Sequence, residues 1–258
     1  MVYQCVAQGR HQAYCGDVIR VLADIPDASI DLLFVDPPYN IGKQFGKIRD
    51  KWPSEQAYLD WCYQWLSLCI DKLKPCGSLY LMASTQMMPY LDLFVRQRMH
   101  VLSRIVWTYD SSGVQAKRSF GSLYEPILFA VKDPKNYTFN ADAIQIEAPT
   151  GAKRKLIDYR KDPPQVYNST KLPGNVWYFA RVRYRMPEYC SHPSQKPMAL
   201  LERILLASSH PGDLVLDPFA GSFTTATVAQ QLERHSISIE LNEDYFQAGL
   251  KRLGFTYP

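Results

Sequence analysis

Two apolar segments that each end in Asp-Pro constrain the fold of this chain more than any other feature. Residues 29–35 (SIDLLFV) run into Asp36-Pro37-Pro38-Tyr39, and residues 213–216 run into Asp217-Pro218. Short apolar runs of this kind are typical of buried parallel strands, and proline ends a strand because it lacks the N–H that the ladder needs. Both carboxylates are therefore expected at strand tips, facing the crevice at one edge of a parallel sheet.

Strands and helices alternate around these two segments. At 258 residues, the chain has room for one α/β domain that carries a large insertion. The alternation predicts a doubly wound, mostly parallel sheet with helices on both faces. The predicted helices cover residues 54–73, 87–99, 197–208, 224–233 and 243–253, and the predicted strands cover residues 29–35, 78–82, 102–108, 127–131, 213–216 and 236–239.

The segment after Asp217 has the composition of a nucleotide-binding loop. Ala220, Gly221 and Ser222 precede a predicted helix, and small residues let the backbone approach a ligand at a helix N-terminus. Glu240 ends the next strand 23 residues after Asp217, near the spacing of ~20 at which such folds place an acid on ribose hydroxyls. The absence of G-x-G-x-x-G favours a nucleoside without a pyrophosphate over a dinucleotide. Because a glycine turn and a strand-end acid occur in many α/β proteins, a purely structural role stays open.

Asp36-Pro37-Pro38-Tyr39 is the more specific motif, because it matches a demanding reaction. The exocyclic amine of a nucleobase is a weak nucleophile, since its lone pair is delocalised into the ring. The Asp36 carboxylate and the Pro37 carbonyl can each accept one N–H, which orients the amine for in-line attack and increases electron density on nitrogen. Tyr39 offers an aromatic face on which a base outside the duplex can stack. The alternative, a Pro-Pro turn beside a core tyrosine, is the weaker interpretation of this tetrad at a strand end.

Residues 133–191 carry the whole positive excess of the chain. They contain ten Lys or Arg against six Asp or Glu, whereas the remaining residues contain 19 of each kind. Six of the 18 prolines and nine aromatic residues also lie there. This composition indicates a loop-rich insertion that meets a polyanion, with a solvated irregular surface as the alternative. The candidate phosphate or base-edge contacts are Lys153, Arg154, Lys155, Arg181, Arg183 and Arg185.

Cysteine and histidine spacing predicts neither a metal site nor a disulfide framework. The six cysteines form no C-x-x-C pair, and the five histidines show no H-x-x-x-H spacing. No apolar run approaches the roughly 18–20 residues of a membrane-spanning helix, and the first residues lack the apolar stretch of a signal peptide. We therefore expect a cytoplasmic protein that uses no metal.

Together, these motifs resemble the β-class adenine-N6 DNA methyltransferases, which use S-adenosylmethionine. The resemblance covers nearly the whole chain through Gly16-Asp17, residues 36–40 (DPPYN), 104–109 (RIVWTY), 192–197 (HPSQKP) and 217–225 (DPFAGSFTT). In this class the catalytic half precedes the cofactor half, a circularly permuted order. The resemblance implies a Rossmann-like methyltransferase domain with its catalytic half in residues 1–132, a target-recognition insertion in residues 133–191 and its cofactor-binding half in residues 192–258.

The resemblance also implies roles for individual residues. Asp36, Pro37 and Tyr39 match the catalytic tetrad, in which Pro38 shapes the turn. Phe223 departs from the family, which often has glycine there, and the bulky side chain bears on the packing of helix against cofactor. The implied cofactor-binding residues are Asp17 for the cofactor adenine, Ser194 and Lys196 for the methionine end, Asp217, Phe219, Ala220, Gly221 and Ser222 for the loop, and Glu240 for the ribose.

Three further segments resemble the subgroup of this family that modifies the palindrome ATGCAT. They are residues 111–117 (SSGVQAK), 156–161 (LIDYRK) and 173–177 (PGNVW). The resemblance implies double-stranded DNA as the partner and ATGCAT as the target, which the residues themselves do not derive. A homodimer and a companion restriction endonuclease are compatible with the sequence, which decides neither.

Three other interpretations stay open. Cytosine-N4 methylation shares the chemistry and the fold, although Ser rather than Asp typically begins the tetrad of the cytosine enzymes. RNA or a protein amide is an alternative substrate, against which the basic insertion argues. A DNA-binding module with a degenerate cofactor site is the alternative from a different class, prompted by Phe223.

Overall fold

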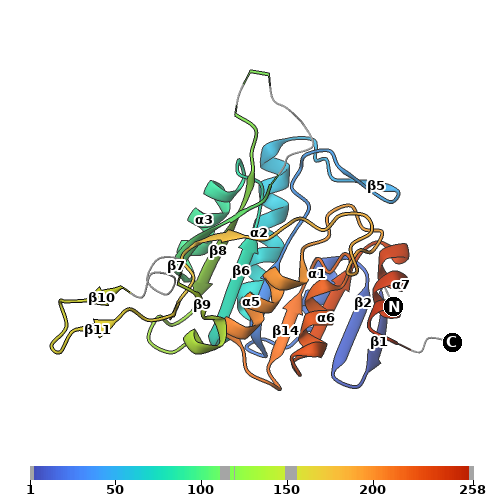
Figure 1. Cartoon of the computed structure of the whole chain (residues 1–258). Coiled ribbons are helices and arrows are strands. Elements are labelled where there is room, and N and C mark those ends of the chain that lie inside the picture. Colours follow the sequence, from blue (N-terminus) through green and yellow to red (C-terminus); the bar gives the residue numbers. More distant parts are fainter. Residues whose placement is uncertain (1–2, 111–116, 119, 149–155, 256–258) are drawn as a thin grey trace.

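A nine-stranded sheet forms the centre of the molecule in the computed structural model, which describes residues 3–110, 117–118, 120–148 and 156–255. The strands lie in the order β1, β2, β15, β14, β3, β6, β8, β7, β13 (Figure 1). In that order their bounds are Gln4–Gln8, His11–Cys15, His235–Glu240, Leu214–Asp217, Ile30–Val35, Leu73–Met82, Tyr124–Val131, His100–Thr108 and Val176–Tyr178.

Most neighbouring strands are parallel, which confirms the predicted sheet. The strands from β2 through β15, β14 and β3 to β6 are parallel throughout, and β13 is parallel to β7. β8 is antiparallel to both of its neighbours, and β1 is antiparallel to β2. Because β3 and β14 are parallel neighbours, the two Asp-Pro junctions lie side by side at one edge of the sheet.

Helices cover both faces of the sheet, as the sequence predicts. α1 (Val18–Asp24), α2 (Glu55–Lys72) and α3 (Met88–Arg96) share one apolar cluster with the sheet, and α5 (Met198–Ser208) and α6 (Thr224–Gln231) share another. α7 (Glu243–Arg252) packs against β2 and β15.

Strand β3 shows why its sequence is almost continuously apolar. Leu33 and Val35 belong to the cluster under α2, whereas Leu32 and Phe34 belong to the cluster under α5. Successive side chains of a strand point to opposite faces, so a strand covered on both faces needs apolar residues at every position. The same burial holds the end of β3, and with it Asp36, in a defined place.

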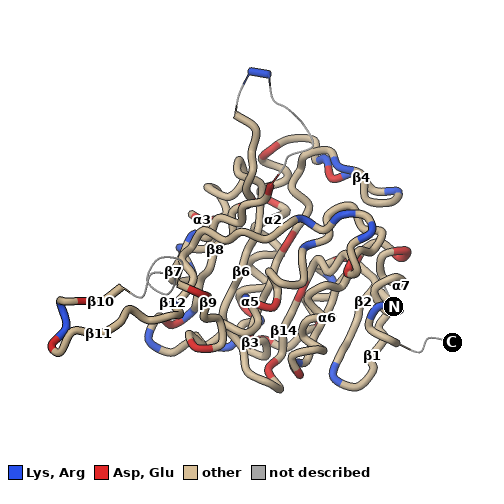
Figure 2. Tube along the Cα trace, viewed as in Figure 1, with Lys and Arg blue, Asp and Glu red and all other residues tan. Residues whose placement is uncertain are grey.

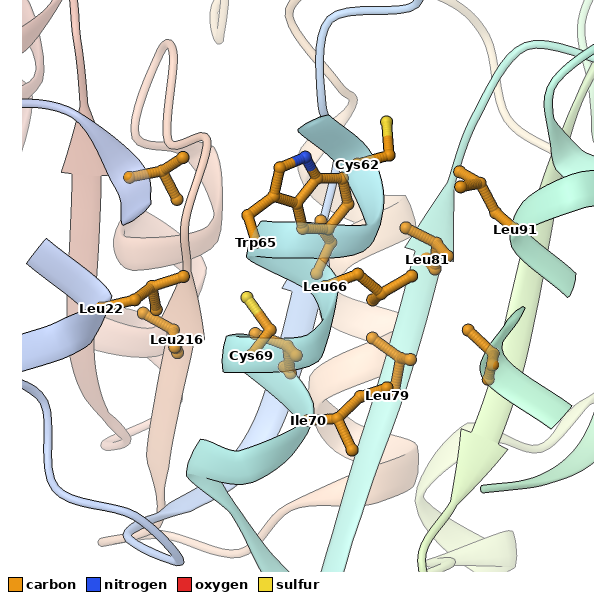
Figure 3. Packing of buried hydrophobic residues seen from close by; sticks show 14 of the residues in the cluster. Leu22, Cys62, Trp65, Leu66, Cys69, Ile70, Leu79, Leu81, Leu91 and Leu216 are labelled. Carbon is orange, nitrogen blue, oxygen red and sulfur yellow. The ribbon is translucent and has the colours of Figure 1, made fainter. Parts of the chain in front are cut away.

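Helix α2 covers the centre of one face. In Figure 3 its Leu66 and Ile70 lie beside Leu79 and Leu81 of β6. All four side chains are buried, and each contributes about 1.5–3 kcal/mol to folding. This packing supports the part of the sheet from which the tetrad emerges.

Strand β6 and the N-terminal elements differ from the sequence prediction. β6 begins at Leu73, so Gly77 lies inside the strand rather than ahead of it. The register of β3 against β6 shifts between Ile30 and Leu32, and a Cβ on Gly77 would lie 3.1 Å from the Ile30 carbonyl oxygen. Glycine at this bulge thus lets two backbones approach closely.

The sequence prediction also misses β1, β2 and α1, which are short and mix polar with apolar residues.

The described part of residues 133–191, which leaves out residues 149–155, contributes short elements to the fold. η1 (Ala141–Ile144) precedes β9 (Ile146–Glu147), β10 (Ile157–Asp158), β11 (Gln165–Val166) and β12 (Thr170–Lys171), and β10 and β11 form a hairpin that projects from the body (Figure 1). The chain then returns to the sheet as β13, a strand of three residues that the sequence prediction misses. None of the helices in the described ranges is long and apolar enough to cross a membrane.

Candidate active site

Two cavities lie at the carboxyl ends of the strands, beside the tetrad that follows β3. Cavity 1 has a volume of about 290 Å³ and cavity 2 a volume of about 270 Å³. Both are lined by Pro37 and Pro38, and also by Phe45, Asp50 and Ser194. The tetrad is therefore the place at which ligands in the two cavities would meet.

The structure brings together the residues that the sequence assigns to a cofactor. They surround cavity 1 and a hollow of about 20 Å³ that shares part of its wall. Asp17, Ser194, Phe219, Gly221 and Glu240 line cavity 1, and Lys196, Asp217, Ala220 and Ser222 line the small hollow.

Glu240, at the end of β15, holds the loop that follows β14. Its Oε2 accepts the N–H of Gly221 at 2.8 Å, and its Oε1 accepts the N–H of Asn242 at 2.8 Å. Burial raises the pKa of Glu240, while the N–H groups of Asn242 and Gly221 act in the opposite direction. Since each carboxylate oxygen has two lone pairs, Glu240 can fix the loop and still accept from hydroxyl groups of a ligand.

Asp17 caps helix α1 and lines cavity 1 close to Glu240, because the ends of β2 and β15 are paired. Its Oδ1 accepts the N–H of Ile19 at 3.1 Å and the N–H of Arg20 at 3.2 Å. Both bonds use one carboxylate oxygen, so the side chain retains acceptor capacity toward a donor in the cavity that it lines.

Gly221 lets two distant segments come into contact. Its φ is +48°, and a Cβ at this position would lie 2.8 Å from Cε1 of His192. Glycine meets both demands, the left-handed backbone and the close approach. Burial, with the charges of Lys196 and Lys43, lowers the pKa of His192 to about 3, so a neutral imidazole faces the loop.

Phe223 points into the core and is not among the residues that line either cavity. The side chain is fully buried, and its ring lies edge-on to that of Phe246, with 6.2 Å between the centroids. Gly249 of α7 provides the space, since a Cβ there would lie 2.1 Å from the Phe223 ring. The Phe223 side chain, which replaces the family's glycine, thus fills the core between α6 and α7. The neighbouring Gly221 and Ser222 line the cavity and the small hollow instead.

The turn of the tetrad is supported by side chains that the sequence does not single out. The Tyr58 hydroxyl donates to the Pro38 carbonyl at 2.8 Å, and the Tyr39 N–H donates to Oδ2 of Asp50 at 3.2 Å. In the described part of the chain no hydrogen bond ends on the Pro37 carbonyl oxygen. Tyr58 and Asp50 therefore hold the turn at Pro38 and Tyr39, while the Pro37 carbonyl oxygen stays available to accept a hydrogen bond from a ligand.

Asp36, Tyr39, Glu125 and Lys196 form a hydrogen-bonded group, called here the acidic cluster. Nζ of Lys196 lies 2.6 Å from Oδ2 of Asp36 and 3.5 Å from Oε2 of Glu125. The Tyr39 hydroxyl lies 2.7 Å from Oδ1 of Asp36 and 3.0 Å from the same Glu125 oxygen. Segments far apart in the sequence thus converge on the carboxylate of the tetrad.

Charges within the acidic cluster are set by burial and by the two carboxylates. Burial opposes the charge on Lys196, but Asp36 and Glu125 outweigh it and raise the pKa of this ammonium group. Burial and the same carboxylates raise the pKa of Tyr39 well above its ordinary value. Lys196 is therefore a cation in this site, and the Tyr39 hydroxyl is a neutral donor.

The candidate DNA contacts are described only in part. Lys153, Arg154 and Lys155 lie outside the described residues. Arg181 lines cavity 2, where its guanidinium lies 4.8 Å from the ring centroid of Tyr109. Arg181 is thus placed to contact a ligand of cavity 2.

Two other candidate arginines make contacts of their own. Nη2 of Arg183 lies 2.6 Å from Oδ2 of Asp110, and the Arg185 guanidinium lies 5.7 Å from the ring centroid of Tyr184. Further basic positions lie on the hairpin of β4 (Gln44–Phe45) and β5 (Ile48–Arg49) and on nearby loops, as Figure 2 shows. The edge of the sheet that holds the cavities therefore has basic loops around it.

The described residues contain no group of three or more His, Cys, Asp or Glu side chains that could hold a metal ion.

A family model for DNA methylases, N6_N4_Mtase, matches residues 30–251 of this chain. The chain belongs to this family of DNA methylases. It is 58% identical to the "DNA adenine methyltransferase YhdJ" of Escherichia coli (strain K12), over 92% of this chain and 81% of that protein. It is 35% identical to "Type II methyltransferase M.HpaI" of Haemophilus parainfluenzae, over 93% of this chain and 73% of that protein.

Solved structures of DNA methylases share the fold. The crystal structure of an M1.HpyAVI–SAM complex has a TM-score of 0.66 and 24% identity, covering 94% of this chain and 98% of the other. The PvuII DNA methyltransferase, which is named as cytosine-N4-specific, has a TM-score of 0.72 and 18% identity, covering 95% and 87%. These likenesses confirm the Rossmann-like methyltransferase fold, and the fold alone does not distinguish an adenine from a cytosine methylase.

Glu125 is the main site residue that sequence reasoning misses. Glu125 is the second residue of β8 and lies two positions ahead of the predicted strand at residues 127–131. A charged residue beside proline at the start of an apolar strand was an available signal. Its partners, however, come from residues 86 and 71 positions away in the chain, Tyr39 and Lys196.

Proposed function

We propose that this methylase transfers a methyl group from S-adenosylmethionine to the N6 amine of an adenine that has left duplex DNA. The observation that carries the proposal is the meeting of two cavities at the tetrad, where Asp36 and the Pro37 carbonyl supply acceptors. The 58% identity to a protein named DNA adenine methyltransferase supports adenine as the base.

Cavity 1 has the donor and acceptor groups that S-adenosylmethionine requires. Asp17 can accept from the cofactor amine, and Glu240 can accept from ribose hydroxyls. Ser194, which lines cavity 1, and Lys196, in the small hollow beside it, would contact the methionine end. When bound, the cofactor supplies a methyl group made electrophilic by the positive charge on its sulfur.

Cavity 2 would receive the extruded adenine. Tyr39 and Tyr109 line it and offer aromatic faces, while Arg181 stands at its wall. Asp36 and the Pro37 carbonyl would each accept one N–H of the amine, so that the nitrogen lone pair points toward cavity 1. Positive charge that develops on the amine would then lie beside carboxylate, which stabilises the transition state more than the ground state.

The insertion in residues 133–191 is the proposed target-recognition region. It holds the positive excess of the chain, and the candidate contacts Arg181, Arg183 and Arg185 lie in its last part. Duplex DNA is the proposed partner, since base extrusion lets an enzyme reach an atom hidden in the stack. ATGCAT is the proposed target on the basis of the resemblance alone. A homodimer, a companion endonuclease and a cytoplasmic location stay predictions.

Cytosine-N4 methylation is the second candidate, because a solved neighbour named cytosine-N4-specific has this fold. Both bases present an exocyclic amine, so the geometry of the tetrad serves either reaction. Asp36 at the head of the tetrad favours adenine.

The test is expression in a host that lacks adenine methylation, followed by single-molecule sequencing of the genome. We expect N6-methyladenine confined to one short motif, and none with the Asp36→Ala variant. Methylcytosine would establish the second candidate. Soluble wild-type protein that binds S-adenosylmethionine and leaves DNA unmodified would overturn both.

A further inference from the structure

Glu125 occupies a position in the acidic cluster that the proposed reaction leaves unexplained. It lies near the start of β8, its side chain is 18% exposed, and it lines cavity 2. One of its oxygens, Oε2, is within 3.0 Å of the Tyr39 hydroxyl and 3.5 Å of Nζ of Lys196. Both of these partners also bind Asp36, so Glu125 reaches the tetrad carboxylate through two neighbours.

Lys196 would weaken Asp36 as an acceptor if it had no other partner. Its ammonium lies 2.6 Å from Oδ2 of Asp36 and is 6% exposed, so water screens the pair poorly. A buried pair of one ammonium and one carboxylate has no net charge to attract a third group such as the amine. An amine that must become positively charged would gain little from such a pair.

Glu125 changes this balance by adding a second carboxylate. Two carboxylates and one ammonium leave the acidic cluster with one net negative charge, because the Tyr39 hydroxyl is neutral. The hydroxyl has a single proton and two carboxylate neighbours, so Asp36 and Glu125 share it. The negative charge is thereby held next to the acceptor that faces the amine.

We propose that Glu125 is a positioning residue for methyl transfer: it shares the Lys196 ammonium and the Tyr39 hydroxyl, so that Asp36 stays an effective acceptor for the amine. This inference rests on the proposed function, since it assigns Glu125 a part in that reaction. In the step, the nitrogen lone pair bonds to the methyl carbon while the bond from that carbon to sulfur breaks and leaves its electron pair on sulfur. Nitrogen is then positive until one of its two protons passes to the Asp36 carboxylate that accepts its N–H, and the acidic cluster stabilises this charge.

The test compares single-turnover methylation by Glu125→Gln with that of the wild type, on a duplex that the wild type modifies. We expect a rate about 10- to 100-fold lower at saturating cofactor and DNA, with both dissociation constants within about threefold of the wild type. Glu125→Asp should recover part of the rate. Glu202→Gln, an exposed carboxylate on α5, is the matched control and should behave as the wild type.

A second background separates a charge effect from a structural one. In Lys196→Met there is no ammonium to offset, so adding Glu125→Gln should slow the reaction by less than about threefold or accelerate it. A purely structural role for Glu125 predicts the same loss in both backgrounds and would overturn the proposal. If Glu125→Gln alone does not fold, the double variant, which removes both charges, is compared with Lys196→Met by the same measurement.

Activity of the wild type distinguishes failure of this inference from failure of the proposed function. A wild type that modifies no DNA would refute the proposed function. A wild type that methylates DNA at the same rate as Glu125→Gln refutes only the role of Glu125.

Discussion

Asp36 directly follows β3 and Asp217 ends the neighbouring parallel strand β14, and proline comes after each acid, yet their surroundings differ. Asp36 is paired with the Lys196 ammonium and the Tyr39 hydroxyl, and it lines cavity 1. Asp217 is 4% exposed and is bound by the Thr225 hydroxyl at 2.5 Å and the Phe219 N–H at 3.1 Å.

The difference shows that one local motif supports two kinds of role. At the first strand end, the Lys196 ammonium lies 2.6 Å from a half-buried carboxylate. At the second, burial raises the pKa of Asp217 to about 7, against the hydrogen bonds from Thr225 and Phe219. The first acid is placed to act on a ligand, and the second is placed to hold the loop that follows it.

The largest expected effect is loss of the first acid. Asp36→Ala should reduce single-turnover methylation by at least about 1,000-fold, because the amine loses a charged acceptor in the transition state. Cofactor binding measured by calorimetry should change little, since Asp17 and Glu240 remain. Turnover close to that of the wild type would show that Asp36 is not the acceptor.

Asp217→Asn tests the second acid through the pH dependence of stability. Asp217 has its pKa raised from 3.8 to about 7 on folding, so the unfolded chain loses this proton at lower pH than the folded chain. The free energy of unfolding should therefore fall by up to about 4 kcal/mol as the pH rises from about 4 to about 7, and level off above that range. Asn cannot ionise, so the variant should lose this part of the slope in urea unfolding at several pH values. An unchanged slope would argue against a raised pKa.

The aromatic residues after the two acids should separate base binding from cofactor binding. Tyr39→Ala should weaken binding of the extruded base by about 1–3 kcal/mol, because stacking is lost. Tyr39→Phe keeps the ring, so it should retain base extrusion and show only a slower methylation step. Phe219→Ala should instead weaken cofactor binding, since Phe219 lines cavity 1 and packs on Trp65 with 5.0 Å between centroids.

Fluorescence of a 2-aminopurine placed at the target base measures extrusion, and calorimetry measures cofactor binding. The two variants should give opposite patterns in these assays. Equal effects of Tyr39→Ala and Phe219→Ala on cofactor binding would contradict the assignment of the cofactor to cavity 1 and of the base to cavity 2.

The smallest effect is expected at the loop after Asp217. Gly221→Ala places a methyl group 2.8 Å from the His192 ring at a φ of +48°, whereas Gly9→Ala imposes similar strain at +59° with no atom within 4 Å. Each should lose about 1–2 kcal/mol of stability from the left-handed backbone. Only Gly221→Ala should also weaken cofactor binding. Matching cofactor affinities in the two variants would show that the close approach to His192 has no part in the site.

The longer strands and helices of the core follow from local sequence, and most contacts of the site do not. The apolar residues 30–35 and the helical spacing of residues 55–72 are local patterns, so their strand and helix were predictable. Asp50 and Tyr58 support the tetrad through side-chain bonds to its backbone, and a local pattern carries no sign of such partners. β13 escaped prediction because three residues show no periodicity.

By itself, the sequence determined the alternating α/β elements, the two acids at strand ends and the glycine-containing loop, because each depends on residues that are close together in the chain. Only the tertiary structure decided that Lys196 meets both Asp36 and Glu125, that Phe223 turns into the core, and that the tetrad lines two cavities. The physical reason is that charge, burial and cavity shape arise between segments that pairing of the strands brings together. A residue's neighbours along the chain do not set these properties.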